Sequence, residues 1–100
     1  MHNADCQTFS LSASTNEVTV SWSPNTNQAD RFEIRVPGIG TTFIGNGDQL
    51  RQGGESQVPG LTPGFTYMVR VYTMNGISET EIFSQRETTS KSSVSQNVIR

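Results

Sequence analysis

Apolar and polar residues alternate along three stretches in the first third of the chain. Within residues 7–13, 17–23 and 31–36, every second position is apolar from Phe9, Val18 and Phe32 onward, and Ser, Thr, Arg or Glu stand between. A period of two is that of a β-strand with one face buried and the other in solvent. We therefore predict three strands with the inward residues Phe9, Leu11, Ala13, Val18, Val20, Trp22, Phe32, Ile34 and Val36.

The rest of the chain shows the same strand-like alternation in segments of different length. Further strands are predicted at 41–44, 56–58, 65–74 and 80–88, and Asn75-Gly76 is a hairpin turn signal. The glycine-rich residues 45–54 are predicted to form a loop, and no window of twelve residues has a helical period. Short strands separated by frequent turns are typical of an all-β sandwich.

A strong turn signal precedes the strand at 65–74. Residues 61–67 read Leu-Thr-Pro-Gly-Phe-Thr-Tyr, and Pro-Gly favours a turn because proline presets φ and glycine accepts positive φ. Tyr67 then opens an alternating strand, which is the arrangement of a tyrosine corner, where the hydroxyl bonds to backbone a few residues upstream. We predict that Tyr67 and Leu61 are core residues at this corner.

The composition fits one domain of this kind. One hundred residues is a single-domain length, and the 12 serines and 12 threonines suit the solvent faces of strands. The net charge is −2 and the basic residues are scattered, so we expect no nucleic-acid partner. We also expect no membrane insertion and a monomeric isolated domain. The predicted division is an extension at 1–6, a domain at 7–89 and a linker or tail at 90–100.

Reactive groups are scarce. His2 is the only histidine and Cys6 the only cysteine. One residue of each type is too few for a structural zinc site, and a single cysteine forms no internal disulfide. Cys6 is interpreted as a small buried hydrophobe or an exposed thiol near the N-terminus. The alternative is that it pairs with another chain or a neighbouring domain. We therefore predict no catalytic residues, no metal and no cofactor, and a protein that is not an enzyme.

The place of the single tryptophan resembles that in the fibronectin type III family. An immunoglobulin domain carries its core Trp on the third strand against a disulfide, whereas Trp22 lies on the second predicted strand. The resemblance covers about residues 7–89 and implies an all-β, seven-stranded antiparallel β-sandwich, immunoglobulin-like and of fibronectin type III topology. The sequence Gly-Leu-Thr-Pro-Gly at residues 60–64 is similar to the corresponding motif in repeats of receptor tyrosine phosphatase ectodomains. The residues that carry the family resemblance are Val18, Val20, Trp22, Phe32, Ile34, Leu61, Pro63, Gly64, Tyr67, Val69, Val71, Asn75 and Gly76.

Domains of this family are scaffolds, so the resemblance implies a non-catalytic role. It would be a spacer, adhesion or recognition module of a multidomain extracellular or cell-surface protein. Its partners would be neighbouring domains of the same protein and an unidentified protein. The alternative is an accessory module that positions a catalytic domain in a secreted enzyme.

The first candidate surface for a partner is an outer sheet face. Adjacent third and sixth strands, as the family has them, would place Arg31 and Arg35 beside Arg70, Tyr72 and Met74. Arg, Tyr and Met are enriched at protein interfaces. The simpler interpretation is a solvated face of alternating charge.

The second candidate is a group of loops. Seven alternating strands leave the chain ends at opposite poles, so that loops 24–30, 45–54 and 74–79 gather where the chain enters, and 14–16, 37–40 and 61–64 gather at the other pole. Loops on a rigid scaffold often carry binding residues. Leu50 and Ile77 are the predicted exposed apolar residues of the first group, although single exposed apolar residues are common.

Overall fold

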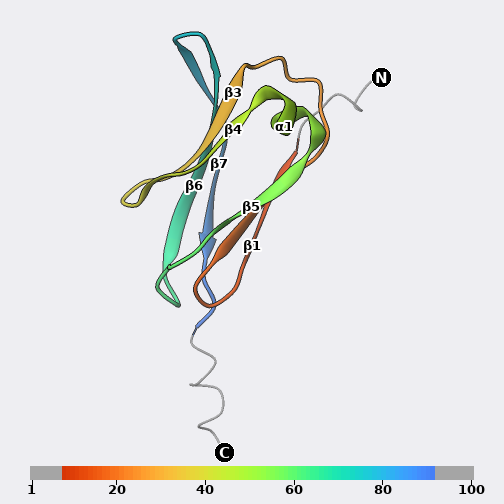
Figure 1. The fold of residues 1–100 in the computed structure, drawn as a ribbon. Helices are drawn as coiled ribbons and strands as arrows, with labels where there is room; N and C mark the ends of the chain where they lie inside the picture. Colours follow the sequence, from red (N-terminus) through yellow and green to blue (C-terminus); the bar gives the residue numbers. More distant parts are fainter. Residues whose placement is uncertain (1–7, 92–100) are drawn as a thin grey trace, which may run out of the picture.

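The computed structural model describes residues 8–91. Within that range two antiparallel sheets face each other (Figure 1), one in the order β1-β2-β5 and one in the order β4-β3-β6-β7. The strands number seven in this part of the sequence, which confirms the predicted all-β sandwich. Their bounds are β1 Phe9–Ala13, β2 Val18–Trp22, β3 Arg31–Val36, β4 Gly40–Asn46, β5 Gly54–Val58, β6 Thr66–Asn75 and β7 Ser78–Thr88.

The inward residues of the alternating stretches form the core between the sheets. Those of β2 and β3 are buried, and those of β1 are half-buried against the core. The Trp22 indole is 7% exposed and lies edge-on to Phe32, with 5.1 Å between the ring centroids. Trp22 also donates from Nε1 to the main-chain oxygen of Gln49 at 3.0 Å. The prediction of Trp22 as a core residue is therefore confirmed.

The tyrosine corner is present. The Thr62 N–H donates to the Tyr67 hydroxyl oxygen at 2.9 Å, and Leu61 is 5% exposed. Tyr67 itself is half-buried and packs against the core. The buried Thr89 closes the same region, because its hydroxyl donates to the Thr62 carbonyl at 2.6 Å and accepts from Phe65 N–H at 3.1 Å.

One element was not expected. Residues 45–54 do not form a loop: β4 continues to Asn46, the helix α1 spans Gly47–Gln52, and β5 begins at Gly54. Asn46 caps the helix, because its side chain accepts from Gln49 N–H, and the Gln49 side chain accepts from Asn46 N–H, both at 2.8 Å. This reciprocal capping box satisfies two otherwise unpaired donors. The helix leaves the sandwich intact because it only connects the edge strands β4 and β5.

The helix also corrects the placement of Leu50. The sequence places this leucine in an exposed loop, whereas its side chain is fully buried in the core. Gly47 allows the helix to approach the 24–30 loop, because a Cβ there would collide with the Ala29 carbonyl oxygen. Within residues 8–91 no helix is long and apolar enough to cross a membrane.

The two ends of the described segment lie at opposite poles (Figure 1). Thr8 accepts a hydrogen bond from Ser23 N–H at the pole that carries α1 and the β6–β7 hairpin, here called the helix pole. Ser90 N–H donates to Ser14 at the pole of the tyrosine corner, here called the corner pole. The turn at 37–40, which was expected at the corner pole, instead projects from the side of the sandwich. Cys6, His2 and most of the predicted tail lie outside the described residues.

Candidate interaction surfaces

The outer face of the four-stranded sheet carries an ordered charge network. Strands β3 and β6 are neighbours, as the family resemblance implied, and their register sets Arg35 opposite Arg70 and Glu33 opposite Tyr72. The Arg35 guanidinium lies 4.1 Å from the centre of the Tyr72 ring. It continues across β6 to β7, where it donates two hydrogen bonds of 2.9 Å to the Glu79 carboxylate. A planar guanidinium suits both the ring face and the paired carboxylate oxygens.

Neighbouring carboxylates neutralise Arg35 and Arg70 on this face. Arg35 also contacts Glu33 at 3.0 Å, and Arg70 pairs with Glu81 at 2.9 Å. The hydrogen bonds from Arg35 hold the pKa of the Glu79 carboxyl below its usual value. The charge of Arg35 and Arg70 is therefore balanced by Glu79 and Glu81 of β7, which the sequence did not place beside these arginines.

The other two residues predicted on this face, Arg31 and Met74, differ in their exposure to solvent. Arg31, at the start of β3, is exposed and makes no ion pair with any residue in 8–91. Met74 was expected to point outward with Arg70, but it is only 4% exposed. It is not one of the residues of the core cluster between the sheets.

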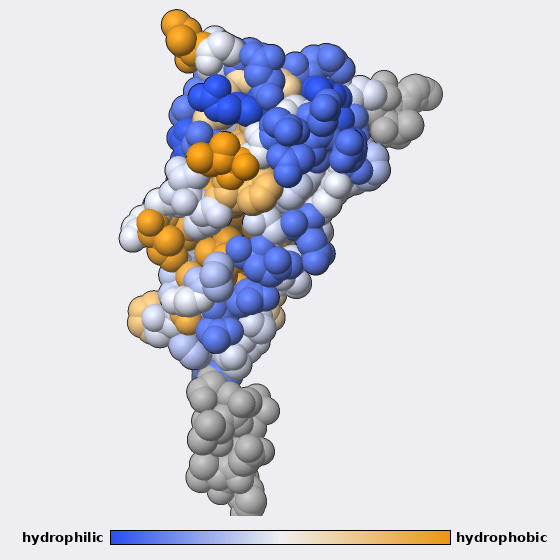
Figure 2. Space-filling view, viewed as in Figure 1, coloured by the Kyte–Doolittle hydropathy of each residue, from blue (hydrophilic) through white to orange (hydrophobic). Residues whose placement is uncertain are grey.

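Apolar surface gathers beside this network, over β4 and the turn that precedes it (Figure 2). Ile44 is 62% exposed on β4 and Ile39 is 51% exposed in the 37–40 turn. Sequence reasoning placed Ile44 in a strand but did not single it out. The alternation could have done so, because an inward Phe43 leaves Ile44 pointing to solvent.

At the helix pole, the 24–30 loop is held by side-chain hydrogen bonds. The buried Asn25 amide donates to the Leu50 carbonyl at 2.7 Å and to the Ser23 carbonyl at 2.9 Å. Its Oδ1 accepts from Asn27 N–H at 3.0 Å, and Asn27 in turn accepts from Ala29 N–H at 2.9 Å. Asparagine favours such local bonds to backbone. The loop is therefore a fixed part of the scaffold.

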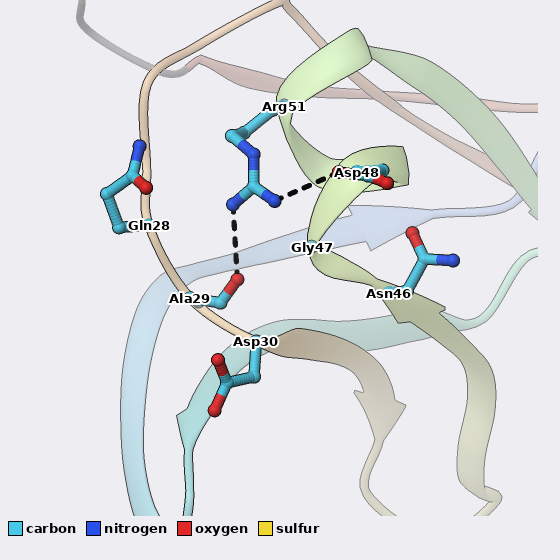
Figure 3. Close-up of a pocket in the computed structure, with 7 residues that line it drawn as sticks. All are labelled: Gln28, Ala29, Asp30, Asn46, Gly47, Asp48 and Arg51. Carbon is cyan, nitrogen blue, oxygen red and sulfur yellow. Dashed lines mark hydrogen bonds and ion pairs between the residues drawn. The ribbon is translucent and has the colours of Figure 1, made fainter.

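A polar hollow lies between this loop and α1 (Figure 3). Its volume is about 420 Å³. Arg51 spans it, donating to the carbonyls of Asn27 and Ala29 at 2.9 and 3.3 Å and to Asp48 at 3.1 Å. The hollow offers hydrogen-bonding groups, and no cluster of three metal-ligating side chains is found among the described residues. Its lining residues are Gln28, Ala29, Asp30, Asn46, Gly47, Asp48 and Arg51.

Ile77 stands at the same pole, fully exposed, as the sequence predicted. It is the second of the two residues that connect β6 and β7, because Asn75 pairs with Ser78. The first connecting residue is Gly76 with φ +60°. A glycine at this first position is the requirement of a tight hairpin, so the turn lies one residue later than the Asn75-Gly76 signal suggested.

Comparison with known proteins agrees with this architecture. The family model of the fibronectin type III domain matches residues 7–90. No curated protein matches the sequence. Among solved structures, a computationally redesigned β-sandwich protein is similar with a TM-score of 0.63 and 16% identity, over 84% of this chain and 92% of that one. At that identity the likeness concerns the fold alone, whereas the family match spans most of the sequence, and the chain therefore belongs to the fibronectin type III domain family.

Proposed function

We propose that this domain is a non-catalytic spacer and protein-recognition module of a multidomain protein at the cell surface or outside the cell. Fibronectin type III domains are general structural and interaction modules, and they are often extracellular. The observation that carries the spacer role is the placement of Thr8 and Ser90 at opposite poles, each bonded into the sandwich. A polypeptide threaded in this way holds the domains before and after it apart.

The spacer role can be tested with two spin labels. We would place them at Thr8 and Lys91 in a Cys6→Ser background and measure the distance between them by double electron–electron resonance. A rigid spacer gives one narrow distance distribution, and the same protein in urea gives a broad one. A broad distribution in the folded domain would contradict the proposal.

For recognition, the helix pole is the surface that we favour. It combines a fixed loop, a polar hollow and the exposed Ile77, which is the mixture of apolar and hydrogen-bonding groups that protein interfaces use. The adjoining domains of the parent protein and candidate binding proteins would be titrated against the wild type, Ile77→Ser and Ile44→Ser. Loss of binding in Ile77→Ser alone supports the helix pole, and loss in Ile44→Ser alone moves the contact to β4.

The accessory role in a secreted enzyme uses the same geometry. Replacing the domain in its parent protein by a flexible linker of equal length distinguishes the accessory role from the recognition role. Loss of a catalytic activity that resides elsewhere in that protein favours the accessory role, and loss of partner binding favours recognition.

A further inference from the structure

The domain contains two Asn-Gly pairs, and the fold treats them differently. They are Asn46-Gly47 and Asn75-Gly76. In such a pair the main-chain nitrogen of glycine reaches the side-chain carbonyl carbon of asparagine easily, because glycine has no Cβ to obstruct the approach. We propose that Asn75 is a site of spontaneous deamidation and isoaspartate formation, and that the helix cap protects Asn46 from the same reaction.

The reaction needs only water. The Gly76 amide gives up its proton to solvent, and its nitrogen attacks Cγ of Asn75, so that a new bond forms between these two atoms. The bond between Cγ and Nδ2 of Asn75 then breaks and ammonia leaves, which gives a cyclic imide. Water opens the ring at either carbonyl. One opening yields aspartate with the original main chain, and the other yields isoaspartate, in which the main chain runs through Cβ.

Asn75 is free to react in this way. It is exposed at the end of β6, and its side chain makes no hydrogen bond to any residue that the structure describes. Gly76 is exposed in the hairpin, and its N–H donates to Asp30 Oδ2 at 3.1 Å. That hydrogen bond is exposed to solvent, and within residues 8–91 it is the one hydrogen bond that the Gly76 nitrogen makes. Brief openings of the hairpin therefore free this nitrogen to attack.

Asn46 is held at both reacting groups. Its Oδ1 accepts from Gln49 N–H at 2.8 Å, which fixes the carbonyl that would be attacked. The nitrogen of Gly47 donates to the Asp30 main-chain oxygen at 2.8 Å, and Gly47 is buried. Attack at Asn46 therefore requires loss of the helix cap and of the contact between α1 and the 24–30 loop.

Conversion of Asn75 would alter the helix pole. It replaces a neutral amide with a carboxylate, which takes the formal net charge from −2 to −3. The new charge arises next to the residue whose N–H binds the Asp30 carboxylate. Isoaspartate also lengthens the main chain by one carbon at a position paired with Ser78. Both changes weaken the contact between the β6–β7 hairpin and the 24–30 loop. The inference holds whether or not the domain is a spacer.

The test is ageing of the folded domain in mildly alkaline buffer, followed by proteolysis and mass spectrometry. Peptides that contain residue 75 or residue 46 are scored for the mass gain of an amide-to-acid change, and an isoaspartyl methyltransferase detects isoaspartate. We expect conversion at Asn75 to be at least about tenfold faster than at Asn46, since a helix cap must open first at Asn46. The rate at Asn75 rises with pH because the attacking nitrogen must lose its proton.

Two controls separate structure from local sequence. In urea both pairs should convert at similar rates, and Asn75→Ser should abolish the signal at residue 75 while leaving the rate at Asn46 unchanged. Equal rates at the two sites in the folded domain, or no conversion at Asn75, would overturn the proposal. So would a lag at Asn46 that persists in urea, because the fold would then not be its cause.

Discussion

The two poles of this sandwich are closed by different means. At the corner pole, the Tyr67 hydroxyl and Thr89 bind nearby backbone. At the helix pole, α1 places Leu50 in the core as a plug, and Arg51 and Asn25 bond the helix to the 24–30 loop. Both poles bury a leucine, Leu61 at the corner pole and Leu50 at the helix pole. At the corner pole the half-buried Tyr67 adds hydrogen bonding, whereas at the helix pole the Trp22 indole also packs in the core and bonds to α1. Burial is worth more free energy than a single hydrogen bond at an exposed position, so the helix pole should be the more sensitive to mutation.

The largest effect should come from Trp22→Ala. The indole packs on Phe32 and Phe43 and donates to Gln49, so that its loss empties the core beneath α1. We expect a loss of about 3–5 kcal/mol in the free energy of unfolding. Urea denaturation followed by circular dichroism measures it, with Trp22→Phe as the milder control. A loss below about 1 kcal/mol would mean that this side chain does not fill the core.

Leu50→Ala tests the plug directly. Because Leu50 is fully buried, we expect the free energy of unfolding to fall by about 2–5 kcal/mol. An exposed leucine in a loop would give almost no change, so the same denaturation experiment distinguishes the two placements. Ile77→Ala is the matched control, since Ile77 is fully exposed at the same pole and its truncation should be nearly neutral.

Asn46→Ala tests the cap that starts the helix. The substitution removes the acceptor for Gln49 N–H and should cost about 1 kcal/mol, whereas Asn46→Ser should retain most of the stability. Hydrogen exchange of the α1 amides adds a local readout. If exchange accelerates equally in β6, the cap supports the whole fold rather than its own pole.

Tyr67→Phe tests the corner pole by the same measurement, the free energy of unfolding. It removes the acceptor for Thr62 N–H at a half-buried site, where water can replace part of the lost bond. We expect a loss of about 0.5–1.5 kcal/mol. If this change proves more costly than Leu50→Ala, the contrast between the poles is wrong.

The smallest effect concerns Glu79, which follows the β6–β7 hairpin but lies on the outer sheet face and closes neither pole, so that it serves as a reference. Its pKa in the folded domain lies below the usual value of 4.5, because Arg35 donates hydrogen bonds to the carboxylate. A lowered pKa adds stability above that usual value, and the stability is lost as the pH falls through the folded-state pKa. The melting temperature of the wild type should exceed that of Glu79→Gln slightly at neutral pH, and the difference should vanish in acid. A difference in melting temperature that grows in acid would mean that the folded-state pKa of Glu79 is raised and not lowered.

The strands and the corner were predictable because their signals are local. Trp22 lies in a five-residue alternation and Tyr67 follows a Pro-Gly turn, so that neighbours in sequence settle both placements. The helix was not predictable by the same means. Six residues are too few to show a helical period. The spacing of Asn46 and Gln49 is a signal of a helix start, but a single leucine follows it in place of an apolar run. The single leucine among polar residues and glycines was therefore interpreted as part of an exposed loop.

The candidate surfaces also contain features that local sequence predicts and features that it does not. That Arg35 and Arg70 share an outer face follows from alternation together with the pairing of β3 and β6. That Glu79 neutralises Arg35 does not, because it depends on the register of β7 and on an irregularity in the β6–β7 pairing after Val71. The bonds from Asn25 to Leu50 and from Arg51 to Asn27 likewise join residues more than twenty positions apart.

The bond from the indole to Gln49 has a practical consequence. Trp22 is the only tryptophan in the sequence, and its polar edge points at the helix while its ring lies in the core. Its emission spectrum should therefore shift to longer wavelength when α1 detaches, before the strands separate. The protein thus carries an intrinsic fluorophore that reports on one end of the molecule, and slow opening of that end can be followed without adding a dye.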